Sequence, residues 1–300
     1  MVLMVMAGLV PAIHVFAEAG PQDVDSTRPG MTAEKAMSPD LYFALSLIVK
    51  MVVTAAFLLA ATISAERAGP LIGGLVATLP ISAGPVYIFL ALDHDSHFIA
   101  QSALGSLVTN AYNTIFAVVY ALLAQSQSLV VSFGIAIAVW TVLTFAGGSV
   151  ARTVPSAVIL NIVIIGLALW ISAPLRHAPM PRVQRRWYDL VLRAIMVALL
   201  VGTVVTLSFR IGPMASGNLA VFPIVLSSIM FILHHRVGGP ATAAVLANAV
   251  IGLGGFAIAV LALNLTAERL GSAPALALAL LVSVSGNLLI YFVRRRLAKP

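Results

Sequence analysis

The sequence predicts an all-α, polytopic transmembrane helical bundle, and two observations support this fold class. The 300 residues are 61% hydrophobic and only 9% charged, with a mean hydropathy of +1.06, whereas soluble domains carry about 25% charged residues. Many continuous apolar runs reach the roughly 20 residues that an α-helix needs to cross a bilayer. Strands of a membrane barrel alternate apolar and polar residues instead, so these continuous runs favour helices.

One segment of the first half recurs in the second half. Residues 67–81 read RAGPLIGGLVATLPI and residues 210–224 read RIGPMASGNLAVFPI, with seven identities in fifteen at a constant offset of 143. The alignment extends upstream, where Lys50 lies opposite Arg193. Duplicated membrane halves with proline-interrupted helices at matching positions are typical of transporters. The sequence therefore predicts an internal repeat of membrane helices.

Polar, glycine and proline breaks divide the apolar sequence into about nine spans. Pro70 and Pro213 each follow a glycine at the predicted first turn of a new helix, where the missing N–H of proline costs nothing. DHDSH at 93–97 is predicted to be a solvated turn rather than a metal site, although His and carboxylate are good zinc ligands. The predicted spans are 41–65, 71–92, 97–124, 129–150, 154–174, 188–209, 214–234, 240–264 and 272–293.

The nine spans predict two four-helix repeats of inverted topology, joined by one extra helix. We assign 39–152 to the first repeat, 153–187 to the linker helix and its following loop, and 188–300 to the second repeat with a basic C-terminal tail. An odd number of spans separates equivalent positions, so the second repeat enters from the opposite side. Ten Lys and Arg residues fall on one face against three on the other, or five when Arg28 and Lys35 of the doubtful leader are counted. The positive-inside rule therefore predicts a cytoplasmic C-terminus and an N-terminus outside.

Residues 1–38 are predicted to be a doubtful or disordered leader with no role in function. Residues 4–31, which include VMAGLVPAIHVF, closely resemble peptides translated from palindromic repeat elements of alphaproteobacterial genomes. This resemblance implies that the true start is Met31 or Met37. A cleaved or amphipathic leader is the alternative, although the first 13 residues lack the Lys or Arg that begins a signal peptide.

The residues expected to line a substrate path surround the two proline breaks. Pro80 and Pro223 each remove a backbone donor near mid-membrane, and such breaks are tolerated only inside protein or beside water. Gly74 and Gly217 are expected to allow close approach, and Asn218 follows in the second segment. A plain kink is the alternative, since proline and glycine are frequent in membrane helices.

Lys50 and Arg193 are matched cations inside predicted spans. An intramembrane charge is costly, so it is a functional hypothesis by default. The alternative is snorkelling, in which the long stem carries the charge to the headgroups. If these cations contact a substrate, that substrate is anionic or zwitterionic. The amides within the spans, Asn110 and Asn161 among them, are expected mainly to join helices.

These features predict a small secondary transporter or permease of the bacterial inner membrane. The duplicated Gly-Pro…Pro pattern resembles small bacterial permeases with internal inverted repeats, at the level of fold alone. The alternative is a membrane assembly factor, or a subunit of a larger membrane complex, that transports nothing. No enzyme activity, cofactor or metal is predicted, because the polar residues form no acid–base or metal cluster. The lipid bilayer is the expected partner and a homo-oligomer is compatible with the sequence, but no nucleic acid is expected because the basic residues lie in loops.

Overall fold

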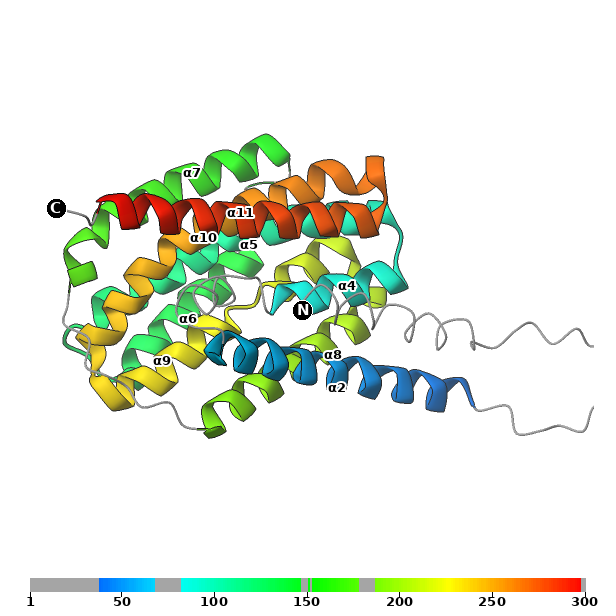
Figure 1. Cartoon of the computed structure of the whole chain (residues 1–300), viewed down its shortest axis with the longest axis horizontal. Helices are drawn as coiled ribbons and strands as arrows, with labels where there is room; N and C mark the ends of the chain where they lie inside the picture. Colours follow the sequence, from blue (N-terminus) through cyan, green and yellow to red (C-terminus); the bar gives the residue numbers. More distant parts are fainter. Residues whose placement is uncertain (1–37, 68–81, 147–150, 152, 178–186, 298–300) are drawn as a thin grey trace, which may run out of the picture.

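The computed structural model describes residues 38–67, 82–146, 151, 153–177 and 187–297, and these ranges contain helices but no strand. Most of the helices run lengthwise through the molecule (Figure 1). Their bounds are α2 Pro39–Arg67, α4 Ala83–Asp93, α5 Ser96–Leu123, α6 Leu129–Ala146, α7 Val154–Ile171, α8 Trp187–Ala220, α9 Ile224–Val237, α10 Gly239–Leu270 and α11 Ser272–Leu297, with a short 3-10 helix at Ala173–His177.

Seven helical stretches among the described residues are long and apolar enough to cross a membrane, and α4 is a shorter apolar helix. One of the seven, Tyr188–Val237, combines α8 and α9. Large apolar side chains point away from the bundle, as lipid requires: Val130 is 80% exposed, Phe145 83% and Trp170 77%. The chain is therefore a multi-pass helical membrane protein. In lipid, helices satisfy their own backbone hydrogen bonds, which explains why the continuous apolar runs adopt this structure.

Helix α5 forms the centre of the bundle. It packs against α6, α7, α8 and α10, and 78% of its most apolar stretch is buried, compared with 11% for α2 and 17% for α7. Asp95 caps its first turn by accepting a hydrogen bond from the Phe98 amide at 2.8 Å. Its apolar side chains Phe116 and Tyr120 are fully buried in the main core.

Helices α5 and α10 pack closely along their length and run antiparallel. At one end, His97 Nδ1 of α5 lies 2.7 Å from Glu268 Oε1 of α10. At the other end, Gly239 begins α10 against the backbone of Ala124, and a Cβ at Gly239 would overlap the Ala124 carbonyl. The bundle thus has two ends, which are fixed by the opposite directions of these two central helices.

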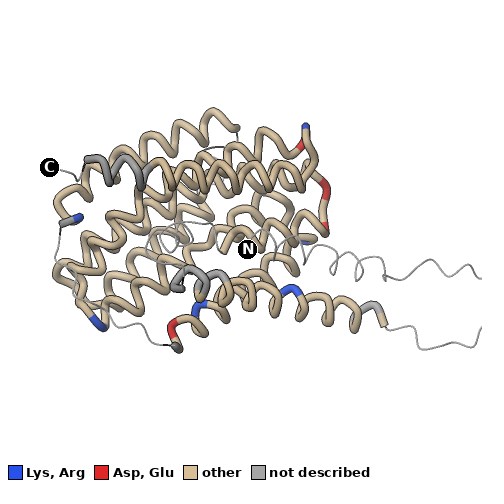
Figure 2. The backbone as a smooth tube through the Cα atoms, in the orientation of Figure 1, with Lys and Arg blue, Asp and Glu red and all other residues tan. Residues whose placement is uncertain are grey.

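We name the two ends after residues in their turns. The Asp93 end holds the turn between α4 and α5 and the turn between α10 and α11, whereas the Arg236 end holds the turns between α5 and α6 and between α9 and α10. Charged positions gather mainly at these two ends (Figure 2). Gly238 and Gly271 make the last two turns with φ of 84°, a left-handed conformation that favours glycine.

The break expected between the sixth and seventh spans takes a different form from the prediction. Residues 210–213 were expected to form a turn between two helices, but they lie inside α8, where only Gly212 leaves helical geometry with φ 76° and ψ 175°. Glycine tolerates this backbone conformation, and Pro213 then occupies the first turn of the continuing segment, where it needs no N–H donor. The chain is therefore redirected without a loop.

The predicted interruption at Pro223 is confirmed. Helix α8 ends at Ala220, and α9 begins at Ile224 with Pro223 as its N-terminal flanking residue. The second predicted span, 71–92, is described only from residue 82 onward. Pro80 and Gly74 therefore lie outside the described residues.

Candidate functional site

The broken segment of α8 packs against the central helix α5 and is buried at Ser216, Gly217 and Ala220. Residues 213–220 form a short helical stretch between Gly212 and the interruption before Pro223. This stretch packs backbone to backbone on α5, because a Cβ at Gly217 would overlap the carbonyl of Ser102. The close approach that was expected at Gly217 is therefore present, and the neighbouring element is α5.

A polar stripe on α5 faces this segment, and we define it as the buried residues Ser102, Ser106, Thr109 and Asn113. Three of its side chains donate to carbonyls of the broken segment: Ser102 Oγ to Pro213 O at 3.0 Å, Ser106 Oγ to Gly217 O at 2.7 Å, and Asn113 Nδ2 to Val221 O at 2.7 Å. Carbonyls near a helix break are tolerated in a membrane only when protein or water satisfies them. Here α5 supplies the donors.

Tyr87 of α4 extends this network. Its hydroxyl lies 2.7 Å from Ser106 Oγ. Because the single Ser106 hydroxyl proton is already donated to Gly217 O, the Tyr87 hydroxyl is the donor of this second bond. The polar stripe therefore connects α4, α5 and α8 in the middle of the bundle.

Asn218 also faces α5. With its amide nitrogen turned toward α5, it donates to Gly105 O at 2.9 Å and to Met214 O at 3.2 Å, and Thr109 Oγ1 lies 3.0 Å away. A Cβ at Gly105 would overlap the Met214 carbonyl, so the two helices meet without intervening space here. Of the expected path residues, Gly217 and Asn218 are thus brought together against the polar stripe.

The other amides join helices, as expected. Asn110 Nδ2 donates to Asn161 Oδ1 of α7 at 2.9 Å and to Leu253 O of α10 at 3.0 Å. Asn161 Nδ2 donates in turn to Leu107 O at 2.7 Å. Such interhelical bonds contribute about 1 kcal/mol each in membrane proteins. The amides therefore stabilise the contact of α5 with α7 and α10.

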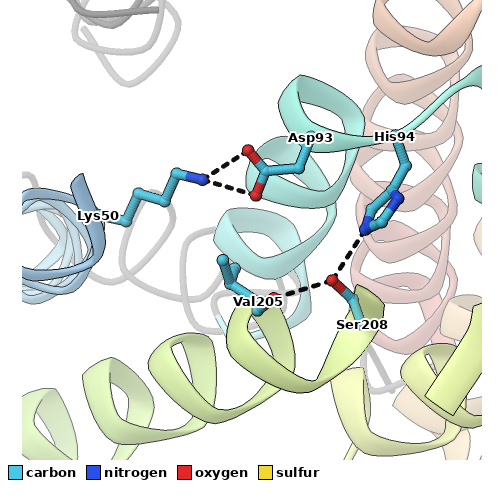
Figure 3. Close-up of polar contacts among 5 residues, drawn as sticks. All are labelled: Lys50, Asp93, His94, Val205 and Ser208. Carbon is cyan, nitrogen blue, oxygen red and sulfur yellow. Dashed lines mark hydrogen bonds and ion pairs between the residues drawn. The ribbon is translucent and has the colours of Figure 1, made fainter. Parts of the chain in front are cut away.

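Lys50 forms an ion pair with Asp93, which links α2 to the end of α4 (Figure 3). Its Nζ lies 2.6 Å from each carboxylate oxygen, and the two side chains are only 12% and 16% exposed. The ammonium is also 5.9 Å from the centre of the Phe89 ring, a cation–π distance. Lys50 is the tenth residue of the apolar stretch Leu41–Ala60. Its charge is compensated by a carboxylate of the protein, and both interpretations of Lys50 stay open.

His94 follows Asp93 and contacts α8 (Figure 3). Its Nε2 lies 2.8 Å from Ser208 Oγ, and Ser208 Oγ donates to Val205 O at 2.8 Å. The only hydroxyl proton is thereby used, so His94 Nε2 carries a proton and donates to Ser208. The ring stacks on Phe98 with centroids 3.8 Å apart and planes 6° from parallel.

Burial lowers the pKa of His94 below its ordinary value of about 6.5. The nearby carboxylates of Asp93 and Asp95 act in the opposite direction, and Lys50 lowers the pKa further. Desolvation is the largest of these effects, because burial disfavours the charged imidazolium. At neutral pH the ring is therefore neutral and protonated on Nε2.

A second, partly buried ion pair lies at the Arg236 end. Arg236 donates to both oxygens of Asp189, with Nη1 at 2.7 Å and Nη2 at 2.6 Å, and the two side chains are 20% and 8% exposed. The pair links the first turn of α8 to the last turn of α9. Bidentate guanidinium–carboxylate contacts are the strong form of this interaction.

Arg193 lines a cavity beside this second pair. The cavity has a volume of about 220 Å³ and is lined by Asp189, Leu190, Arg193, Ile229, Ile232, Leu233 and Arg236. Arg193 and Lys50 were both expected to be site residues, but they lie toward opposite ends of the bundle. Arg193 is therefore placed with Arg236 rather than with the polar stripe.

The sequence analysis missed Asp93, Asp189 and Arg236. Asp93 was assigned to a solvated turn, and Arg236 counted only toward orientation. One signal could have identified two of them, because residues 93 and 236 are 143 apart and are equivalent in the repeat alignment. Within the described ranges, no group of three His, Cys, Asp or Glu residues could hold a metal ion.

The chain matches no protein-family model, and it has no significant match among curated proteins or solved structures. The interpretation of the site therefore depends on its geometry. That geometry combines an interrupted helix that packs on the central helix α5 with one partly buried ion pair toward each end.

Proposed function

We propose that this chain is a small secondary transporter of the bacterial inner membrane that works by alternating access around proline-broken helices. The observation that carries the proposal is the interrupted segment 213–220, which packs on the central helix α5 and contacts its polar side chains. Discontinuous helices form the substrate sites of many transporters. By the repeat alignment, the segment around Pro80 is its counterpart.

The helix boundaries support two repeats. Helices α5 and α6 begin at Ser96 and Leu129, and α10 and α11 begin at Gly239 and Ser272. Each helix of the second pair begins 143 residues after its counterpart (96 + 143 = 239; 129 + 143 = 272), which is the offset of the matching sequence segments. The counterparts α5 and α10 run antiparallel, as inverted topology requires.

Two sets of contacts support a pseudo-two-fold relation between the halves. Asn110 Nδ2 donates to Leu253 O, and these residues are 143 apart, so each meets its own counterpart, as occurs only near a two-fold axis. In addition, α6 packs against α9 and α11 packs against α4. By the offset of 143, α11 is the counterpart of α6 and α9 is the counterpart of α4, so a two-fold axis would convert one of these contacts into the other. A transporter with this symmetry can rock one half against the other.

The orientation proposed for the chain follows from its basic residues. Arg176 and Arg236 lie at the Arg236 end with the C-terminal end of α11, which carries RRR at 294–296. We therefore assign the Arg236 end to the cytoplasm and the Asp93 end to the outside. The N-terminus is then outside and the C-terminus is cytoplasmic.

The cavity at the Arg236 end supports a small anionic or zwitterionic substrate. Guanidinium groups bind carboxylates and phosphates bidentately, and both Arg193 and Arg236 line this cavity together with the carboxylate of Asp189. Four apolar residues complete the lining. The cavity would admit such a molecule from the cytoplasmic side before it reaches the interrupted helix.

Single cysteines test the topology, because the chain has none of its own. Ser126 lies in the turn at the Arg236 end and Ser272 begins α11 at the Asp93 end. We expect a membrane-impermeant maleimide to label Ser272→Cys in intact cells and to label Ser126→Cys only in inside-out vesicles. Labelling of both positions from the same side would refute the inverted repeats. Uptake of radiolabelled amino acids and carboxylates into proteoliposomes then tests transport itself.

A membrane assembly factor, or a subunit of a larger complex, is the second candidate. Two observations favour it. The interrupted segment packs tightly on α5, and no residue of α5 lines the described cavity, so that cavity does not reach the polar stripe. A protein with this function needs no path through the bundle. It predicts no substrate uptake into proteoliposomes, even when the cysteine labels confirm opposite orientations of the two halves.

A further inference from the structure

The two partly buried ion pairs occupy similar places in the proposed repeats. By the offset of 143, Lys50 corresponds to Arg193 and Asp93 corresponds to Arg236. Lys50 pairs with Asp93 across α2 and α4. Arg236 pairs with Asp189, which lies one helical turn before Arg193 on α8. Each pair therefore joins the first helix of its repeat to the short helix that follows the proline break.

Each pair joins elements that otherwise share little contact. Among the described residues, α2 packs extensively only against α8, and the contact between α8 and α9 is much smaller than that between α5 and α10. All four side chains of the two pairs are at most 20% exposed. The ion pair between His97 and Glu268 is different, because its side chains are 68% and 53% exposed and solvent screens it.

The pair at the Asp93 end is also connected to the interrupted helix. His94, adjacent to Asp93, donates to Ser208 Oγ, and Ser208 lies four residues, or about one turn, before the non-helical Gly212. A displacement of the turn that carries Asp93 is therefore transmitted to the last turn of α8 before its break. This connects separation of α2 from α4 with movement at the centre of the bundle.

We propose that the two ion pairs are the gates of the transport path, one at each end, and that they open alternately. Separation of Lys50 from Asp93 opens the polar stripe to the outside, and separation of Asp189 from Arg236 opens it to the cytoplasm through the adjoining cavity. In the conformation described here both pairs are formed, so both gates are closed. This inference rests on the proposed transport function and adds the residues that control access.

A cysteine at Ser106 reports access to the polar stripe, since Ser106 is 0% exposed and serine-to-cysteine is a small change. A charged thiosulfonate reagent that does not cross membranes is added to intact cells or to inside-out vesicles. Asp93→Asn and Asp189→Asn are matched gate variants, because each removes one carboxylate. Glu268→Gln, which removes the exposed pair at the Asp93 end, is the control.

We expect Asp93→Asn to raise the modification rate of Ser106→Cys from the outside by about tenfold, because the rate scales with the fraction of molecules that are open. Asp189→Asn is expected to do the same from the cytoplasmic side only, and Glu268→Gln to change neither rate. The exchange Lys50→Glu with Asp93→Lys restores an ion pair and should restore protection. This exchange also supplies the decisive measurement if Asp93→Asn does not fold.

Two results would overturn the gate assignment, and they differ in what they say about transport. If Ser106→Cys is modified equally fast with and without the gate variants, or if both variants open the same side, a path exists but these pairs do not control it. If Ser106→Cys is never modified from either side, even when Asp93→Asn and Asp189→Asn are combined, no path exists. In that case the transport proposal fails together with the gates.

Discussion

The ion pairs at the two ends of the bundle each join a long helix to a short one, but with the charges exchanged. At the Asp93 end the long helix α2 supplies the cation and the short helix α4 supplies the carboxylate. At the Arg236 end the long helix α8 supplies the carboxylate and α9 supplies the cation. Each end therefore has an ion pair between a long helix and a short one. Which of the two helices supplies the cation differs between the ends.

The two cations also differ chemically. An arginine presents several N–H donors in a planar fork that matches a carboxylate, whereas a lysine ammonium is a compact charge on a flexible stem. Arg236 in addition shares its cavity with Arg193, and Lys50 has no second cation among the residues that it is described to contact. The Arg236 end should therefore tolerate the loss of its carboxylate less well than the Asp93 end.

The largest loss of folding stability is expected for Asp189→Asn, which removes the carboxylate of the ion pair at the Arg236 end. The variant leaves the Arg236 guanidinium charged but without the carboxylate that it contacts bidentately, next to the second guanidinium of Arg193 in the same cavity, so the unfolding temperature should fall. Thermal unfolding of the purified protein in detergent measures the loss. The double variant Asp189→Asn with Arg236→Gln is the control and should recover most of it. A smaller loss than that of Asp93→Asn would contradict the ranking.

Asp93→Asn is expected to lower the unfolding temperature less than Asp189→Asn does, because the Lys50 ammonium keeps its contact with the Phe89 ring and has no second cation among its described contacts. Thermal unfolding of both variants in the same detergent makes the test. An equal or larger loss for Asp93→Asn would show that the two ends do not differ in the way proposed.

A smaller effect on folding stability is expected from the titration of His94, which lies next to the ion pair at the Asp93 end. Its pKa is lowered in the folded state, so the unfolded chain binds a proton below pH of about 6.5 while the folded chain still does not. Folding stability therefore falls as the pH drops below about 6.5. His94→Gln keeps a donor for Ser208 but removes the titration, so the acid-side slope should flatten. An unchanged slope would assign the acid sensitivity to other groups.

The smallest effect is expected for Glu268→Gln, which removes an ion pair that is exposed at the Asp93 end. Both partners are more than half exposed, and exposed pairs contribute about 0–1 kcal/mol. The unfolding temperature should therefore change little, and added salt should reduce any remaining difference. A loss as large as that of Asp93→Asn would show that burial does not determine the contribution of these pairs.

The sequence predicted the features that depend on local chemistry. The continuous apolar runs predicted the long helices, and the break at Pro223 is present where a proline removes a helix donor. The amides were expected to join helices, and Asn110 and Asn161 do so. Gly217 was expected at a close approach, which its contact with Ser102 provides. Each of these predictions needed only a residue type and its position within an apolar run.

The partners of the charged residues could not be predicted in the same way. Lys50 was singled out, but its partner lies 43 residues away in a turn that the local sequence marks as solvated. Asp189 and Arg236 are 47 residues apart, and each taken alone is an ordinary residue at the end of a membrane helix. These pairs arise because the fold brings the ends of short and long helices together, and no local pattern encodes that.

The polar stripe has a consequence for how the protein is made. Of the seven membrane-crossing stretches, Ser96–Leu123 has the lowest mean hydropathy, 1.4. Its serines, threonines and asparagines lower this value, and several of them donate to carbonyls of later segments. The segment 213–220 begins 90 residues after α5 ends (213 − 123 = 90), a delay of about 5–20 s at ordinary rates of synthesis. Until then Ser102, Ser106 and Asn113 lack the carbonyls to which they donate in the folded bundle. Release of α5 from the insertion machinery is therefore favoured only once α8 and α10 have emerged, which makes biogenesis of this bundle a late and concerted event.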